Sequence, residues 1–76
     1  MRLFTYVARE NKQYMKEVGF YVSYDIEVYS ADEDMPVASL EDVFTDFDKA
    51  QEFVLLCNEY QLDPIHLEEF CLDYIQ

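Results

Sequence analysis

The sequence predicts an α+β fold, in which a three-stranded antiparallel sheet is followed by two helices packed on one face of the sheet. Three observations support this fold class. Apolar and polar residues alternate in the first half of the chain, two helix-start signals lie in the second half, and 76 residues suffice for one hydrophobic core only. We therefore expect residues 1–76 to form a single small acidic domain.

The first two strands are predicted from composition and alternation. Residues 2–9 are rich in Phe, Tyr, Thr and Val, and the polar residues 10–13 are expected to turn the chain after them. Gly19 opens the clearest strand, because the even-numbered residues of 20–28 are apolar and share one face, while the odd-numbered residues of 21–29 share the other. This period of two indicates a strand with one face against the core.

A third strand is predicted after an acidic loop. Residues 30–36 include three consecutive acids and end at a proline, and the segment 37–44 that follows favours a strand. Val43 and Phe44 interrupt its alternation, so we expect a bulge there.

Two helices are predicted in the second half. Thr45 can accept hydrogen bonds from the first turn of one helix, and Asp63 caps the next, with Pro64 at its first position. The apolar residues at helical spacing in the first helix are Ala50, Phe53, Val54, Cys57 and Tyr60. Those in the second helix are Leu67, Phe70, Cys71 and Tyr74, widened by Ile65, Leu72 and Ile75. Because the connection is short, the helices are expected to be antiparallel or crossing neighbours.

Charge is the most informative feature of the composition. Seventeen Asp and Glu stand against five Lys and Arg, a net charge of −12, and residues 1–16 hold four of the five bases. Such a surface repels nucleic acid and anionic membranes and attracts proteins with basic surfaces. The chain has neither the apolar stretch of a signal peptide nor a run of roughly 18 apolar residues. We therefore expect a soluble cytoplasmic protein, with Cys57 and Cys71 reduced in its core.

The second half of the chain carries a resemblance. The string Leu56–Leu67, followed by Asp73–Ile75, and the upstream pair Ser23–Tyr24 are similar to a family of small uncharacterised domains in Firmicutes. In that family a short sheet precedes a helical pair with the pattern Cys-Asn…Leu-x-Pro-Ile-His-Leu, and the resemblance covers roughly residues 23–75. Asp25 departs from the pattern, which has a glycine there. The resemblance implies the order of the elements and a bacterial or phage setting, but no mechanism, because the family has no settled activity.

Three arrangements could carry chemistry, and each has a simpler interpretation. His66, Glu69 and Asp73 share a helical face and could ligate a metal, but a first-turn histidine with solvated acids has the same pattern. Cys57 with His66 could be a nucleophile and its base, but a thiol on a core face is inert. The acids of 32–34 lack the spacing of a calcium loop. We therefore expect no enzyme, no metal and no cofactor.

The acidic side chains, with two tyrosines that share a strand face with Asp25 and Glu27, are the candidate partner-binding surface, because rings and carboxylates together suit arginine. These candidates are Tyr21, Asp25, Glu27, Tyr29, Asp32, Glu33, Asp34, Glu41, Asp42, Asp46, Asp48, Glu52 and Glu59. The leading hypothesis is a nucleic-acid mimic that blocks the basic groove of a bacterial defence protein or of another DNA- or RNA-handling protein. By composition it is similar to anti-CRISPR and anti-restriction inhibitors of phage. The alternative is a non-catalytic adaptor or regulatory module that binds one protein through its sheet face. A homodimer is compatible with either hypothesis.

Overall fold

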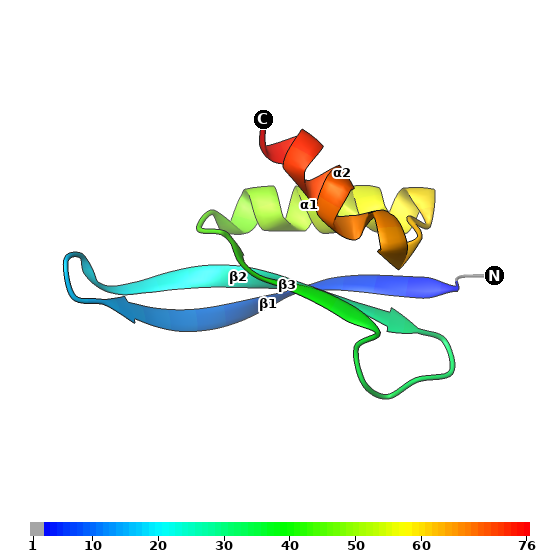
Figure 1. The fold of residues 1–76 in the computed structure, drawn as a ribbon, viewed down its shortest axis with the longest axis horizontal. Helices are drawn as coiled ribbons and strands as arrows, with labels where there is room; N and C mark the ends of the chain where they lie inside the picture. The colour runs from blue at the N-terminus through cyan, green and yellow to red at the C-terminus, as the bar shows by residue number, and fades with distance from the viewer. Residues whose placement is uncertain (1–2) are drawn as a thin grey trace.

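The computed structural model describes residues 3–76 and has the predicted order of three antiparallel strands followed by two helices (Figure 1). The elements are β1 (Phe4–Met15), β2 (Gly19–Ser30), β3 (Ala38–Phe44), α1 (Phe47–Tyr60), the short 3₁₀ turn η1 (Pro64–His66) and α2 (Leu67–Ile75). The sheet order is β1-β2-β3, so β2 is the central strand. Both helices lie on the same side of the sheet (Figure 1). Residue 2 of the predicted first strand lies outside the described residues.

The hydrophobic core lies between the sheet and the two helices. Ile26 and Val28 of β2 are fully buried, as the alternation predicts, and Tyr6 of β1 lies opposite Val28. Phe53 of α1 is the aromatic centre of the core, with its ring centroid 5.2 Å from Tyr74, 5.6 Å from Phe44 and 5.7 Å from Phe70. The buried residues of the core are Tyr6, Ile26, Val28, Phe44, Ala50, Phe53, Val54, Cys57, Leu67 and Cys71.

The first strand is longer than predicted, and the turn expected at residues 10–13 is wrong. Those residues lie inside β1, where each pairs with a residue of β2. The chain turns at residues 16–18 instead, where the Val18 N–H donates to the Met15 carbonyl at 3.1 Å. Gly19 follows with a φ of +83°, a conformation that glycine adopts without strain. The polar residues 10–13 resemble a turn in the sequence, but polar side chains can occupy a strand here because none of the described helices covers this end of the sheet (Figure 1).

The predicted bulge is confirmed at the junction of β2 and β3. The register between these strands shifts between Tyr24 and Ile26, so that Asp25 lies opposite three residues of β3. Asp42, in the middle of those three, has a φ of 53°, which aspartate tolerates better than most side chains. Its backbone N–H donates to Asp25 Oδ1 at 2.8 Å. A carboxylate at position 25 therefore replaces the ladder bond that the bulge removes.

The predicted helix caps are confirmed in one case and wrong in the other. Asp46, rather than Thr45, precedes the first helical residue, and its Oδ1 accepts from the N–H groups of Asp48 at 2.8 Å and Lys49 at 3.5 Å. The cap moves by one residue because the helical backbone begins at Phe47. Asp63 caps η1 as expected, and its Oδ1 accepts from the Ile65 N–H at 3.1 Å.

The apolar stripes of the helices are narrower than predicted. The α1 residues 50, 53, 54 and 57 are buried as expected, but Tyr60 is exposed. In α2, Leu67 and Cys71 are buried, and Phe70 and Tyr74 pack against the core. The three residues expected to widen that stripe, Ile65, Leu72 and Ile75, are all exposed. A helix that packs against neighbours on one side only buries a single stripe.

Two amide side chains at the C-terminal end of α1 pair with the outer edge of β1. Asn58 Oδ1 accepts from the Tyr6 N–H at 2.8 Å, and Asn58 Nδ2 donates to the Tyr6 carbonyl at 3.0 Å. Gln61 acts in the same way three residues later, accepting from the N–H groups of Leu3 and Phe4 and donating to the Phe4 carbonyl. Gln61 holds a left-handed φ of 47° at the helix end. The two amides supply the bonds that a fourth strand would have made, and they fix α1 over this half of the sheet.

Candidate protein-interaction surfaces

The residues predicted to bind a partner lie on two opposite sides of the molecule. Residues 21, 25, 27 and 29 of β2 alternate with Ile26 and Val28, so they lie on the sheet face that the helices leave uncovered. We call these four residues the open sheet face. Asp48, Glu52 and Glu59 lie about 180° around α1 from its buried stripe, given 3.6 residues per turn. The core separates the two groups, so the predicted residues do not form one surface.

The carboxylate of Glu27 on the open sheet face is already engaged within the domain. Its Oε2 accepts from Arg9 Nη1 at 3.2 Å, and its Oε1 accepts from the Tyr29 hydroxyl at 3.1 Å. The Glu27 side chain is only 13% exposed, whereas that of Arg9 is 65% exposed. Burial, and then the hydrogen bond to Glu27, raises the pKa of Tyr29. A partner would meet the Arg9 guanidinium and the Tyr29 ring here before it met a free carboxylate.

Asp25 has a structural position rather than a surface one. The residue is 9% exposed, and its Oδ2 accepts from Asn11 Nδ2 at 3.2 Å while its Oδ1 accepts from the bulge N–H of Asp42. Ser23, next along the same face, is fully buried and accepts from Gln13 at 3.5 Å. The alternation of β2 predicts that both positions face solvent. Neighbouring side chains on the uncovered face bury them instead, which the alternation of β2 alone does not reveal.

The remaining candidates of the sheet are Tyr21 of the open sheet face, Glu41 and Asp42 of β3, and the acids of the β2–β3 loop. Tyr21 donates to Asp42 Oδ2 at 3.4 Å, and burial, followed by the charge of Asp42, raises the pKa of Tyr21. Glu41 is exposed on β3. The three acids of residues 32–34 are exposed in the β2–β3 loop, which projects away from the helices (Figure 1).

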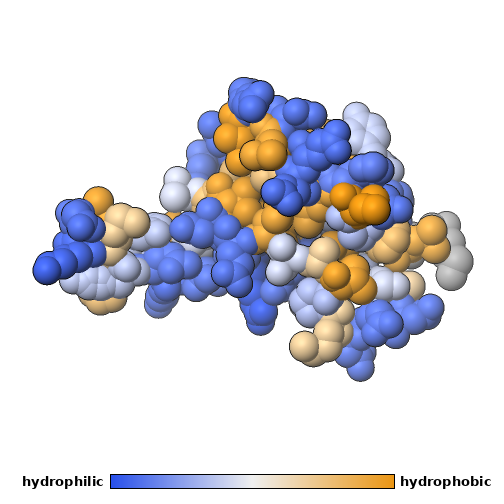
Figure 2. Space-filling model, viewed as in Figure 1, coloured by the Kyte–Doolittle hydropathy of each residue, from blue (hydrophilic) through white to orange (hydrophobic). Residues whose placement is uncertain are grey.

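The outer surface of the helices carries the densest exposed charge. Residues 46–76 contain eight acids and one base, Lys49, and all eight acids are exposed. We call these eight residues the helical acidic surface: Asp46, Asp48, Glu52, Glu59, Asp63, Glu68, Glu69 and Asp73. Figure 2 shows hydrophilic residues over much of the helical layer on the viewed side. Within residues 3–76 the only ion pair on this surface joins Glu69 to His66 at 4.0 Å, and it is charged only when the histidine is protonated.

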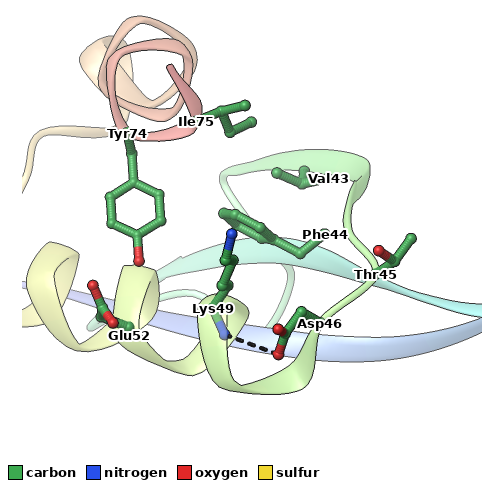
Figure 3. Close-up of a pocket in the computed structure, with 8 residues that line it drawn as sticks. All are labelled: Val43, Phe44, Thr45, Asp46, Lys49, Glu52, Tyr74 and Ile75. Atoms are coloured by element: carbon green, nitrogen blue, oxygen red, sulfur yellow. Dashed lines mark hydrogen bonds between the residues drawn. The ribbon is translucent and has the colours of Figure 1, made fainter.

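A cleft with a volume of about 600 Å³ opens within the helical acidic surface. Its lining residues, drawn in Figure 3, are Val43, Phe44, Thr45, Asp46, Lys49, Glu52, Tyr74 and Ile75. The Tyr74 hydroxyl points from α2 toward α1, beside Glu52 (Figure 3). Burial, and then the neighbouring carboxylate of Glu52, raises the pKa of Tyr74. Two carboxylates with an aromatic ring suit a cationic side chain, and Lys49 is the base that the domain itself places there.

Of the residues weighed for catalysis or metal binding, Cys57 lies in the core, whereas His66, Glu69 and Asp73 are exposed. Cys57 is fully buried, and burial raises the pKa of its thiol to about 12, with a smaller contribution from the neighbouring Cys71. Both cysteines are free thiols in the core, as predicted. Asp73 lines a shallow hollow of about 190 Å³ with His66 and Glu69. In the part of the chain that the structure describes, no three His, Cys, Asp or Glu side chains are grouped as metal ligands.

The β1–β2 hairpin carries an exposed apolar strip that the sequence pattern did not indicate. A strand of 12 residues spans roughly 40 Å, whereas the 14 residues of α1 span roughly 21 Å, so α1 cannot cover the hairpin along its full length. The sequence did not predict this difference in length between β1 and α1, because the turn expected at residues 10–13 made the first strand too short. With the turn placed before Gly19, the two lengths would have predicted an uncovered end.

No protein-family model, curated protein or solved structure matches the chain. Among the described residues, none of the helices combines the length and the apolar character that crossing a membrane requires.

Proposed function

We propose that this domain is a non-catalytic inhibitor that places its helical acidic surface in the basic, nucleic-acid-binding groove of a bacterial DNA- or RNA-handling protein. The observation that supports this proposal most strongly is the group of eight exposed acids in residues 46–76, against a single base. Surface solubility does not require a net charge of −12 in 76 residues.

Three carboxylates of α1 form a regularly spaced row within this surface. Asp48 and Glu52 are one turn apart, which corresponds to a rise of about 6 Å, and Glu59 continues the same line two turns later. These carboxylates are held on a helix whose buried side is fixed by Phe53 and whose end is fixed by Asn58. A rigid row of anions loses little conformational entropy when a basic groove binds it. A nucleic-acid strand presents its phosphates in a comparable row.

The carboxylates that bind the partner in this proposal are not all those that the sequence predicts. Asp25 and Glu27 accept hydrogen bonds within the domain, so they are poor substitutes for phosphates. The cleft beside Glu52 and Tyr74 is a better site for an arginine or lysine of the partner, because its carboxylates lie next to an aromatic ring. Tyr74 therefore replaces Tyr21 and Tyr29 as the expected aromatic anchor.

The test compares two charge reversals of equal size. The domain is immobilised and used to capture proteins from a bacterial extract at about 50 mM and about 200 mM salt, a range over which phosphate-like binding weakens steeply. We expect captured proteins that bind nucleic acid, that are released by added duplex DNA or RNA, and that are lost with the double variant E52K/E59K. The control D32K/E33K makes the same charge change in the β2–β3 loop and should retain them. Capture that is insensitive to salt and to added nucleic acid would overturn the proposal.

A second candidate function uses the open sheet face. Tyr21 and Tyr29 are held by hydrogen bonds to Asp42 and Glu27, so this face presents two oriented rings to a partner. An adaptor of this kind should lose its partner in the variant Y21A/Y29A and keep it in E52K/E59K. The opposite pattern supports mimicry, so the same capture experiment separates the two functions.

A further inference from the structure

Within residues 3–76, the end of the β1–β2 hairpin is a two-stranded ribbon with neither a third strand beside it nor a helix over it (Figure 1). Residues 11–23, which we call the arm, pair only with each other, because the pairing of β3 with β2 begins at Tyr24. Figure 1 shows the arm extending past the ends of both helices. A two-stranded ribbon with both faces uncovered is marginally stable in water, so this region is the part of the fold that would gain most from a covering partner.

One face of the arm is apolar. Tyr14 and Phe20 pair across the two strands, with ring centroids 4.9 Å apart, and Phe20 is 86% exposed. Val22 follows on the same face, and Tyr24 then meets Phe47 of α1 at 5.7 Å. We call Tyr14, Phe20, Val22, Tyr24 and Phe47 the aromatic strip. It runs from the tip of the arm to the N-terminus of α1 on the side of the sheet that the helices occupy.

The two ends of the aromatic strip have opposite charge. Lys12 lies on the same face as the strip, opposite Val22, and Lys16 lies beside Glu17 in the turn at the tip. At the other end, Phe47 lies between Asp46 and Asp48. The arm as a whole holds two bases and one acid, whereas the rest of the described chain holds two bases and sixteen acids. A surface with a basic end, an apolar middle and an acidic end is complementary to a copy of itself turned by 180°.

We infer that a second copy of this chain covers the aromatic strip, so that the protein forms a two-fold dimer through its arms. In this dimer the strips pack face to face and antiparallel, and the basic tip of each arm lies at the acidic start of the partner's α1. Tyr14, Phe20 and Phe47 together expose on the order of 400 Å² per copy, taking about 200 Å² for each aromatic side chain. Two copies therefore remove about 800 Å² of aromatic surface from water, and the flanking side chains bring the contact toward the roughly 1,200 Å² of a small specific interface.

The charge argument favours a copy of this chain over an unrelated partner. A basic protein would be attracted to the helical acidic surface but repelled by Lys12 and Lys16 of the arm. The two-fold dimer brings each of these lysines to the carboxylates beside Phe47 and leaves the rest of the helical acidic surface, with Glu52 and Glu59, on the outside of both copies. Dimerisation is thus compatible with the proposed function without depending on it.

The test measures the mass of the purified protein by sedimentation and light scattering from about 1 μM to about 1 mM, the range in which weak dimers dissociate. We expect the wild-type mass to rise from monomer to dimer across this range, and the variant Phe20→Ser to weaken association at least about tenfold. The matched control is Ile65→Ser, because Ile65 is 81% exposed on the other side of the domain. Neither side chain supports the core, so circular dichroism of both variants should match that of the wild type.

A charge exchange tests the orientation. Lys12→Glu and Asp48→Lys should each weaken the dimer, and the double variant should restore it, because the two-fold operation brings opposite ends of the strip together. A wild-type protein that stays monomeric up to about 1 mM, or a dimer weakened equally by Ile65→Ser and Phe20→Ser, would overturn the inference. Failure of the double variant to recover would overturn the antiparallel arrangement. These measurements use the protein alone, so they are independent of the capture experiment.

Discussion

The two halves of the β1–β2 hairpin have the same alternation of side chains but different surroundings. In the half beneath α1, Ile26 and Val28 are fully buried; in the arm, Phe20 is 86% exposed although it lies on the same face of the same strand. Alternation therefore determines which way a side chain points, but not whether anything covers it. Coverage depends on where the helices lie, and Asn58 and Gln61 fix α1 at one end of the sheet.

The largest expected contrast comes from two phenylalanines. Phe53→Ala removes the side chain at the centre of the core, and we expect it to lower the free energy of unfolding by about 3–5 kcal/mol. Phe20→Ala makes the same chemical change in the arm, where the side chain has almost no buried area to lose, so we expect a change within about 0.5 kcal/mol at concentrations where the protein is monomeric. Urea unfolding followed by circular dichroism measures both. Equal destabilisation by the two variants would mean that the arm is packed in solution.

The sequence predicted the parts of the fold that depend on local pattern. The alternation from Phe20 to Val28, the bulge near the end of β3 and the capping aspartate at position 63 each arise from side chains acting on their immediate neighbours, and each is confirmed. The turn at residues 10–13 failed because polar side chains can occupy a strand wherever no layer covers it.

The candidate surface was harder to predict, because it depends on distant pairs. Nothing in the local sequence shows that Asp25 accepts from the Asp42 N–H, or that Glu27 is held by Arg9. The acids Asp48, Glu52 and Glu59 share one face of α1, which follows from 3.6 residues per turn once the helix is assigned. Which acids are free to meet a partner becomes apparent only once the sheet is folded.

Two asparagines allow a second comparison of the covered half with the arm, with a smaller expected change in the free energy of unfolding. Asn58→Ala leaves the N–H and carbonyl of Tyr6 without their partners at the edge of β1, and we expect a loss of about 1–3 kcal/mol. Asn11→Ala, at the base of the arm, removes one 3.2 Å bond to Asp25, whose other oxygen keeps its partner, so a loss below about 1 kcal/mol is expected. Hydrogen exchange at the Tyr6 amide should accelerate in the first variant only. Unchanged protection there would show that the Tyr6 amide does not depend on Asn58 for its shielding from water.

Alkaline pH tests the covered half through its buried thiol. The pKa of Cys57 is about 12 in the folded protein, against an ordinary value of 9.0, because burial disfavours the thiolate. The unfolded chain therefore loses this proton first, so stability is unaffected below about pH 9 and falls as the pH rises toward 12. Between pH 9 and 10 this group alone lowers stability by about 1 kcal/mol.

The variant Cys57→Ala isolates this contribution. Its melting temperature should fall less steeply between pH 9 and 10 than that of the wild type, while some slope remains because burial also raises the pKa of Tyr6 and Cys71. The comparison of slopes, rather than of absolute stabilities, removes the effect of the small cavity that alanine leaves. Parallel slopes in the two proteins would mean that the thiol is accessible to water.

The smallest effect is expected where the arm meets the covered half, at the ion pair between Arg9 and Glu27. Because the Arg9 side chain is 65% exposed, water screens the pair, and Arg9→Gln should change the free energy of unfolding by less than about 1 kcal/mol. The difference between the variant and the wild type should disappear at about 1 M salt, where the screening length is about 3 Å. A loss above about 2 kcal/mol that persists in high salt would instead indicate a buried, unpaired carboxylate at Glu27. In that case Glu27 would belong to the buried part of the hairpin. Only the arm would then be uncovered.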